Sequence, residues 1–359
     1  MTPGRLPAVR DDLALVDGYH SAQVDVDVRL NTNESPFPPP LAWREAYLAE
    51  LAAVPFNRYP DRRARDLRAA LATAHGVEPG QVVAAKGSNE ILQALCLAYG
   101  GPGRTAAVFE PTYALHSHIA RVCGTTVHIG ERAADLSLDL DEVRRVLDEA
   151  RPAITFLCTP NNPTGLVDPR DVVEAVLELA PGLVVVDEAY AQFAPWSALS
   201  LLAEEPDLPL AVTRTYSKTW SMAALRLGYL VAPPEVVEAC ESVLLPYHLD
   251  AASQIAGRVA LRFSAEMEAR VAAIVSERER LAAALAGLPV DTWASGANFV
   301  LFRPLAMGAT EAWKGLVERS VLVRDCSSWP RLAGCLRVTV GTPTENDAFL
   351  AALREVLSL

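Results

Sequence analysis

Four short segments of the 359-residue chain bring together residue types that could do chemistry jointly. They supply a lysine amine, an aspartate carboxylate, an asparagine amide, a tyrosine phenol and a glycine turn that suits a phosphate. The segments are KGSNE (86–90), TPNNPTG (159–165), VVVDEAY (184–190) and TYSKTWSMAALRLGY (215–229). Each lies at the end of an expected strand, and the carboxyl ends of parallel strands meet at one edge of a sheet. We therefore expect these groups to converge in one cleft.

Each segment taken alone has an ordinary structural explanation. Asn-Asn-Pro-Thr-Gly is a common turn, Lys218 would be a solvated surface residue, and Asp187 at a strand end would cap a helix. Gly-Ser-Asn-Glu would be a simple N-cap, with Ser88 or Asn89 capping the helix that follows. The occurrence of all four segments in this order favours a functional site over four separate structural explanations.

Helix and strand patterns alternate through the first two thirds of the chain. Residues 62–75 form an amphipathic helical pattern that ends at Gly76, and residues 88–101 form another. Apolar strand patterns separate most of the helices, in the segments QVVAAKG, TAAVFE, AITFLC, LVVVDEAY, PLAVTRT and RLGYLVA. Fully apolar strands between helices indicate a mainly parallel sheet that is covered by helices on both faces. The expected fold class is therefore α/β.

The pattern changes near Pro246. A long helical region over residues 251–286 precedes the strand-like segments ANFVLFRP, LVRD and CLRVTVGT, which together indicate a smaller α+β domain. Residues 1–35 show no regular pattern and resemble an N-terminal arm more than a domain. We expect an arm over residues 1–40, a large domain over residues 41–245 and a small C-terminal domain over residues 246–359.

The composition excludes several classes of protein. A formal net charge of −12 argues against a broad surface for nucleic acids or anionic membranes. No apolar run approaches the roughly 20 residues that span a bilayer, and the N-terminus carries acids where a signal peptide would be apolar. The six cysteines form no C-x-x-C pair, and the six histidines show no metal-ligand spacing. We expect reduced cysteines, no metal and a cytoplasmic location.

The combined motifs resemble those of the fold-type I, class I/II aminotransferases, which depend on pyridoxal 5'-phosphate (PLP). Within that family the chain is most similar to the histidinol-phosphate aminotransferases. The resemblance runs from LNTNESP and NRYPD, through the four segments above, to ANFVLF and the pair LVRD and LRVTVGT. It implies that the large domain binds PLP. It also implies transamination between histidinol phosphate and 2-oxoglutarate, giving imidazole acetol phosphate and glutamate in histidine biosynthesis.

The resemblance assigns the reactive groups of the cofactor to particular residues. Lys218 matches the lysine that holds the PLP aldehyde covalently and then moves a proton as general base and acid. Asp187 matches the carboxylate that keeps the pyridine nitrogen protonated. Asn162 and Tyr190 match the donors to the ring hydroxyl. Tyr113 matches the aromatic side chain that stacks on the ring, although it could also be an ordinary core tyrosine.

The cofactor phosphate requires N–H groups at a helix start, hydroxyls and a guanidinium. The matching positions are Ser88, Asn89, Thr215, Ser217 and Arg226. Many relatives have Gly-Ala-Asp-Glu where this chain has Gly-Ser-Asn-Glu, a change that leaves main-chain contacts possible. Tyr59 matches a tyrosine that reaches the cofactor phosphate of the neighbouring subunit, which implies a two-fold homodimer. The alternative for Tyr59 is a turn tyrosine before Pro60.

Two arginines near the end of the chain, Arg324 and Arg337, match positions that bind substrate anions. A guanidinium binds a carboxylate through two parallel hydrogen bonds. The resemblance implies that this pair binds the carboxylate of glutamate in one half-reaction and the phosphate of histidinol phosphate in the other. Arg324 could instead form a surface ion pair with Asp325. Tyr19 matches a tyrosine that closes over the substrate, but Gly18 replaces the usual preceding proline.

Other activities use the same motifs. An aromatic or broad-range aminotransferase is the nearest alternative, and threonine-phosphate decarboxylases share the scaffold. Tyr247 and His248 would either line the imidazole end of the substrate or pack at a domain hinge. A PLP-sensing regulatory module is disfavoured, because only about 35 residues precede the first helix and they contain no basic recognition helix. An inactive α/β scaffold would require Lys218 to be exposed and unmodified.

Overall fold

A computed structural model describes residues 22–358 of the chain. In this part of the chain, seven strands form the sheet of the large domain, in the order β2-β8-β7-β6-β5-β3-β4. These strands are β2 (Val82–Ala85), β3 (Thr105–Glu110), β4 (Thr126–Glu131), β5 (Ile154–Cys158), β6 (Leu183–Asp187), β7 (Leu210–Thr215) and β8 (Gly228–Val231). Neighbouring strands are parallel except at β8, which runs antiparallel to both β2 and β7. The expected α/β fold with a mainly parallel sheet is confirmed.

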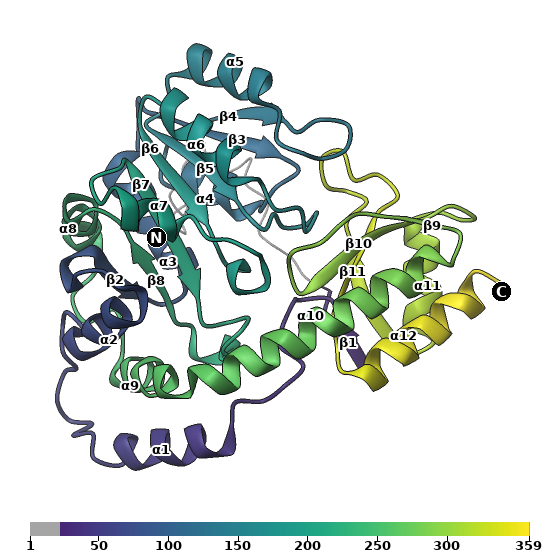
Figure 1. Cartoon of the computed structure of the whole chain (residues 1–359), viewed down its shortest axis with the longest axis horizontal. Helices are drawn as coiled ribbons and strands as arrows, with labels where there is room; N and C mark the ends of the chain where they lie inside the picture. Colours follow the sequence, from purple (N-terminus) through teal and green to yellow (C-terminus); the bar gives the residue numbers. More distant parts are fainter. Residues whose placement is uncertain (1–21, 359) are drawn as a thin grey trace, which may run out of the picture.

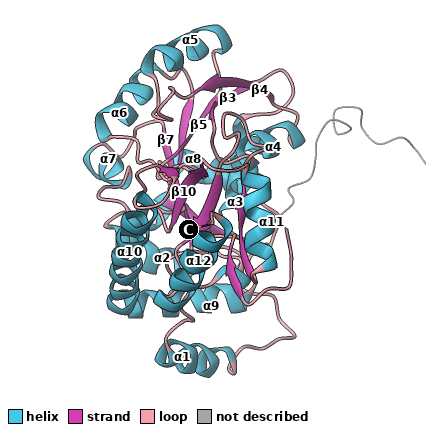
Figure 2. Ribbon diagram, turned by 90° about the vertical axis from the view of Figure 1, so that its right-hand side faces the viewer, coloured by secondary structure: helices cyan, strands magenta, loops and turns pink. Residues whose placement is uncertain are grey.

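Helices cover both faces of this sheet, as Figure 2 shows with α5, α6 and α7 on one side and α3 and α4 on the other. One face packs against α3 (Ser88–Tyr99), α4 (Leu115–Val122) and α8 (Pro234–Val243). The other packs against α2 (Arg65–His75), α5 (Leu140–Ala150), α6 (Arg170–Leu179), α7 (Leu199–Glu204) and α9 (Ala251–Ala260). The period-two alternation of strand side chains explains these layers. Val184 and Val186 of β6 belong to one apolar cluster, and Val185 belongs to the other.

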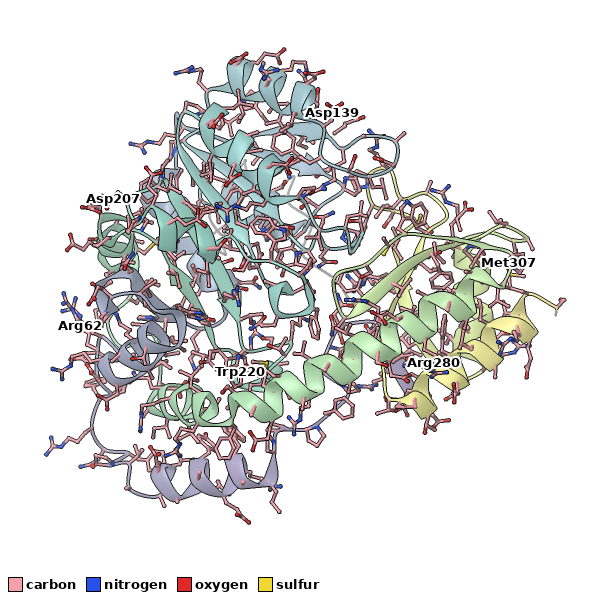
Figure 3. All side chains as sticks on the ribbon, viewed as in Figure 1. Arg62, Asp139, Asp207, Trp220, Arg280 and Met307 are labelled. Carbon is pink, nitrogen blue, oxygen red and sulfur yellow. The ribbon has the colours of Figure 1, made fainter. Side chains whose placement is uncertain are left out.

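The small domain is built on a second sheet, with strands in the order β1-β11-β12-β10-β9. Its strands are β1 (Val28–Leu30), β9 (Val290–Thr292), β10 (Phe299–Pro304), β11 (Val321–Asp325) and β12 (Leu336–Thr339). Its helices are α10 (Ser264–Ala286), α11 (Ala309–Glu318) and α12 (Pro343–Val356). Helix α10 extends from the large domain along the small one (Figure 1). There Arg280 forms a 2.7 Å ion pair with Asp347 of α12 (Figure 3 labels Arg280).

The remaining elements are short. Helix α1 (Leu41–Leu51) packs against α9, where Trp43 donates a 3.3 Å hydrogen bond to the carbonyl of Ala256. Single 3₁₀ turns occur at Pro79–Gln81, Ala191–Phe193, Ala223–Leu225 and Leu261–Phe263. Within residues 22–358, no helix combines the length and apolar character that crossing a membrane would need. All six cysteines are free thiols.

Two expectations about the ends of the two domains need adjustment. The helical region over 251–286 is divided by the 3₁₀ turn at Leu261–Phe263. Part of the segment expected to be irregular forms β1, which pairs in parallel with Val321–Val323 of β11. We propose the division into an arm (1–40), a large domain (41–245) and a small domain (246–359), with β1 joining the arm to the small sheet and α9 packing back against the sheet of the large domain.

The expected cap of α3 is wrong in its details. Gly87, not Ser88 or Asn89, is the N-cap residue, and no side chain accepts a hydrogen bond from the first turn. Gly87 has a φ of 83°, which favours glycine because a Cβ is strained in this region. The first N–H groups of α3 therefore lack the side-chain partner that an ordinary cap provides.

A buried ion pair holds the turn TPNNPTG against the sheet edge. Arg132 directly follows β4 and Asp168 follows the turn. Two hydrogen bonds of 2.8 and 2.9 Å join the guanidinium to the carboxylate, and the two side chains are 1% and 2% exposed. The pair connects two segments that are 36 residues apart and so helps to position the turn.

Replacement of Arg132 by alanine should lower the free energy of unfolding by about 3–5 kcal/mol, because it leaves the Asp168 carboxylate buried without a partner. Urea unfolding measures this loss. As a control, Arg145→Ala removes only exposed ion pairs with Glu142 and Glu149 and should lower it by less than about 1 kcal/mol. Equal losses in the two variants would contradict a distinct contribution from the buried pair.

Candidate active site

A cavity at the carboxyl ends of the parallel strands gathers most of the residues singled out in the sequence. It is lined by Thr32, Asn33, Ser88, Asn89, Tyr113, Cys158, Asn162, Asp187, Ala189, Tyr190, Thr215, Ser217, Lys218, Arg226 and Arg337. The strand order explains the gathering, because β2, β5, β6 and β7 each end at this edge and lead into one of the four segments. Arg337 of β12, from the small domain, and Thr32 and Asn33 of the arm complete the cavity.

Lys218 follows β7, and its amine lies close to groups of both domains. Its Nζ donates a 2.9 Å hydrogen bond to the carbonyl of Thr32 and lies 5.8 Å from the centre of the Tyr190 ring. Burial, followed by the positive charge of Arg337, lowers the pKa of Lys218 to about 7, whereas Glu34 raises it. A substantial neutral fraction of the amine is therefore present near neutral pH, as a nucleophilic lysine requires.

Asp187 ends β6 and is 1% exposed. One of its oxygens lies 3.1 Å from Nε2 of His116, and the other accepts a 3.1 Å hydrogen bond from the N–H of Ala189. His116 is fully buried between the rings of Phe156, which stacks on it, and Tyr113, which meets it edge-on. This carboxylate is thus held rigidly at the floor of the cavity.

The turn before α3 and the segment after β7 form a cradle of donors. The uncapped start of α3 lies beside Arg226, since a Cβ at Gly87 would come within 2.9 Å of the Arg226 guanidinium. The hydroxyls of Thr215 and Ser217 are 3.0 Å apart, and Ser217 also lies 3.4 Å from Nη1 of Arg226. A helix start, two hydroxyls and a guanidinium make a site for a phosphate-like anion.

Asn162 and Tyr190 lie on the side of the cavity that faces the small domain. Asn162 accepts a hydrogen bond from Nη1 of Arg337, and the Tyr190 hydroxyl accepts one of 2.9 Å from Asn33. Burial raises the pKa of the Tyr190 phenol, so this group remains a neutral donor at physiological pH. A second Arg337 nitrogen donates 2.9 Å to the carbonyl of Asn31.

Arg337 is 3% exposed and has no carboxylate partner among the described residues. Arg324 is its direct cross-strand neighbour, in the β11–β12 register. Directly opposed residues of antiparallel strands project to the same face of a sheet. Arg324 therefore shares the face of Arg337, although it does not line the cavity itself.

The other expected residues that the structure describes do not line the cavity. Tyr19 lies outside the described residues. Tyr59 is 80% exposed and stacks on Tyr247, with ring centres 4.5 Å apart. His248 lies 3.0 and 3.1 Å from the carbonyl oxygens of Ala84 and Leu245.

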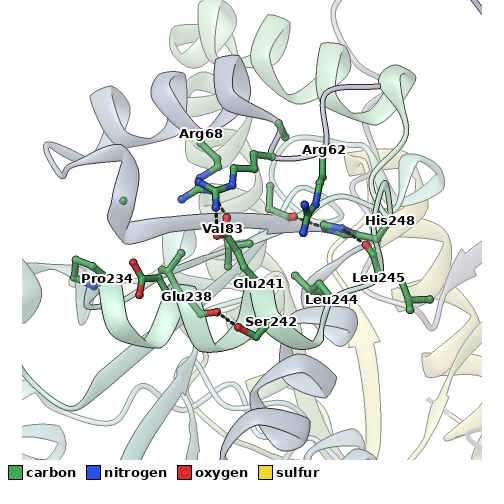
Figure 4. A pocket seen from close by; sticks show the side chains of 15 residues that line it. Arg62, Arg68, Val83, Pro234, Glu238, Glu241, Ser242, Leu244, Leu245 and His248 are labelled. Atoms are coloured by element: carbon green, nitrogen blue, oxygen red, sulfur yellow. Dashed lines mark hydrogen bonds and ion pairs between the residues drawn. The ribbon is translucent and has the colours of Figure 1, made fainter. Parts of the chain in front are cut away.

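His248 instead lines a second hollow, between α2 and α8, which Figure 4 shows. In this hollow Arg68 bonds to both Glu241 and the carbonyl of Pro79. Arg63 also lies 3.8 Å from the Glu241 carboxylate. Apart from His248, this hollow contains none of the residues considered for the active site.

Two functional positions were missed in the sequence. His116 contacts Asp187 from the first turn of α4, and its ring meets that of Tyr113, three residues earlier; this short spacing could have indicated it. Asn33, which bonds to Tyr190 and to Thr339, belongs to the motif LNTNESP, but its partners are more than 150 residues away in the chain. No local pattern reports such contacts.

The lowered pKa of Lys218 can be measured directly, because the chain has only three lysines, Lys86, Lys218 and Lys314. In cofactor-free protein that carries ¹³C-methylated amines, the NMR signal of Lys218 should titrate near pH 7 rather than 10.5. Because burial disfavours the charged form, stability should rise as pH rises between these two values. Lys218→Met identifies the signal, and a midpoint near 10 would contradict the desolvated setting.

Comparison with known proteins shows which family this chain resembles. A family model for class I and II aminotransferases matches residues 25–353. A histidinol-phosphate aminotransferase of Streptomyces avermitilis is 46% identical over 97% of this chain and 96% of its own length. A histidinol-phosphate aminotransferase of Corynebacterium glutamicum is 43% identical over 98% of this chain and 97% of its own length.

A solved structure shows the same fold. The histidinol-phosphate aminotransferase of Sinorhizobium meliloti, in complex with pyridoxal-5'-phosphate, has a TM-score of 0.83 at 23% identity, covering 93% of this chain and 91% of that one. The family match spans most of the chain, and the two curated relatives match it over almost its whole length. The chain belongs to the class I and II aminotransferase family.

Proposed function

We propose that this protein is a PLP-dependent enzyme that transfers an amino group between histidinol phosphate and 2-oxoglutarate, in histidine biosynthesis. Its products are imidazole acetol phosphate and glutamate. The observation that carries the proposal is the near-full-length identity of 43–46% to aminotransferases named for histidinol phosphate. A buried Arg337 without a carboxylate partner among the described residues agrees with a substrate that carries an anion.

The residues of the cavity fit PLP. Ser88, Asn89, Thr215, Ser217 and Arg226 would hold its phosphate. The fit rests on the uncapped start of α3 and on the close approach at Gly87, where a side chain would fill the space in front of Arg226. Tyr113 would lie against the ring, and Asn162 and Tyr190 would donate to its hydroxyl.

When bound, PLP supplies an aldehyde that takes up the amino group and a ring that delocalises the electrons of the broken Cα–H bond. Lys218 would hold the aldehyde carbon and then move the proton between the substrate Cα and that carbon. Asp187 would keep a proton on the pyridine nitrogen, and His116 would orient the Asp187 carboxylate. Arg337 would orient the substrate through its anionic group, with Arg324 beside it.

We further propose a two-fold homodimer in which Tyr59 reaches the cofactor phosphate of the neighbouring subunit. Tyr59 is accompanied by other strongly exposed apolar side chains, Phe56 at 80% and Leu245 at 76%. Large apolar side chains that are this strongly exposed are typical of a protein interface. Tyr19 would close over the substrate. The free cysteines agree with the cytoplasmic location that we propose.

A panel of amino donors with 2-oxoglutarate tests the proposed substrate. Histidinol phosphate should be used with the highest kcat/KM, ahead of phenylalanine, tyrosine and leucine, and threonine phosphate should not be decarboxylated. A preference for phenylalanine or tyrosine would replace the proposed activity with an aromatic aminotransferase.

Lys218→Ala should abolish turnover, and Asp187→Ala should reduce it by several orders of magnitude, because the pyridinium is no longer stabilised.

Mixed dimers test the shared site. Tyr59→Ala and Lys218→Ala should each be strongly impaired as separate proteins. Co-expression of both should restore about a quarter of wild-type activity. About half of the dimers are then mixed, and each mixed dimer of a two-fold enzyme has one intact site out of two. If Tyr59 served its own subunit, no mixed dimer would contain an intact site and no activity would return. Tyr247→Ala, at the stacking partner of Tyr59, controls for loss of the exposed ring pair.

A further inference from the structure

Trp329 lies against both arginines that we assign to the substrate anion. The centre of its ring is 5.3 Å from the guanidinium carbon of Arg324 and 6.0 Å from that of Arg337. Arg337 also lies 5.1 Å from the centre of the Phe299 ring. Cations at such distances from an aromatic face are attracted to it.

The loop that carries Trp329, residues 326–335, has a fixed shape. Three successive turns are closed by backbone hydrogen bonds, from Trp329 to Cys326, from Leu332 to Trp329 and from Cys335 to Leu332. A fourth bond, from Cys326 to Cys335, closes the base of the loop. Cys326, Leu332 and Cys335 are fully buried. The indole is thus presented to the arginines by a loop that is already ordered.

The indole lies where two positively charged side chains face each other. Arg324 and Arg337 are paired directly across β11 and β12, and like charges opposite each other in a sheet repel. The contacts of Arg337 itself are with the amide oxygen of Asn162 and the carbonyl of Asn31, which carry no net charge. An aromatic face attracts both guanidiniums without neutralising either, so it leaves the charge of Arg337 available to a substrate.

We propose, on the basis of the function proposed above, that Trp329 is a positioning residue for anion recognition. It holds Arg337 and Arg324 on one face of the small sheet, in an arrangement that receives the carboxylate of glutamate or the phosphate of histidinol phosphate. Its contribution is to substrate affinity and not to the proton transfer at Lys218.

The test uses the holoenzyme and glutarate, a dicarboxylate without an amino group. Trp329→Leu should weaken glutarate binding about tenfold, as loss of two partly buried cation–π contacts predicts. Trp329→Phe should weaken it less, because an aromatic face remains. In kinetics, KM for glutamate and for histidinol phosphate should rise while kcat changes little, and Arg337→Ala should raise both KM values further.

Two controls separate positioning from stability. Trp293→Leu removes an indole of the same apolar cluster that lies 5.3 Å from Arg303, away from the cavity, and should leave the glutarate Kd unchanged. A ring-fluorinated tryptophan placed only at position 329 keeps the shape and weakens the attraction for cations. It should weaken glutarate binding even if Trp329→Leu fails to fold.

Unchanged glutarate affinity in the fluorinated protein, or equal weakening in the Trp293 and Trp329 variants, would overturn the inference. A fall in kcat without a rise in KM would also overturn it. The proposed function fails separately, if the wild-type enzyme does not use histidinol phosphate. The effect of Trp329 on glutarate binding would still be measurable in that case.

Discussion

The concentration of positive charge in one buried cavity is the constraint on which the rest of the site depends. Lys218, Arg226 and Arg337 all line it, and Asp187 is the single carboxylate among its lining residues. Burial and the neighbouring Arg337 make it unfavourable for Lys218 to carry a charge as well. In a chain with a net charge of −12, this local excess of cations selects for anionic ligands and helps to lower the pKa of the Lys218 amine.

Both sheets contribute residues to this cavity. The parallel strands of the large domain end in the groups that would bind the cofactor, and their buried two-layer packing fixes those ends relative to one another. The small domain supplies Arg337 from β12 and, through β1, the arm segment whose carbonyl groups contact Lys218 and Arg337. The substrate side of the site therefore depends on how the small domain and the arm lie against the large domain.

Much of this arrangement could be predicted from the sequence, because it depends on local signals. Apolar runs located β5 and β7 to within one residue, whereas β6 begins as expected but ends at Asp187, three residues before the end of the expected segment LVVVDEAY. The four segments at strand ends converge as expected. Strand β4, with the sequence TVHIGE, has a mixed pattern at the sheet edge and was not predicted. The break between α9 and α10 was also missed.

The long-range contacts of the site could not be predicted. His116 against Asp187, Asn33 against Tyr190 and Lys218 against Thr32 each join segments that only tertiary packing brings together. The motif NRYPD likewise does not indicate that the Tyr59 side chain is exposed. Sequence motifs therefore identified the residues nearest the proposed cofactor, but not those that orient them.

We propose that Lys218 is the amine that binds the PLP aldehyde. Borohydride reduction of the holoenzyme, followed by peptide mass spectrometry, tests it most directly, because the chain offers only two other lysines. We expect a single pyridoxyl adduct, on the peptide that contains Lys218. An adduct on Lys86, which lies near Arg226 and pairs with Asp250, or on Lys314 of α11, would contradict it.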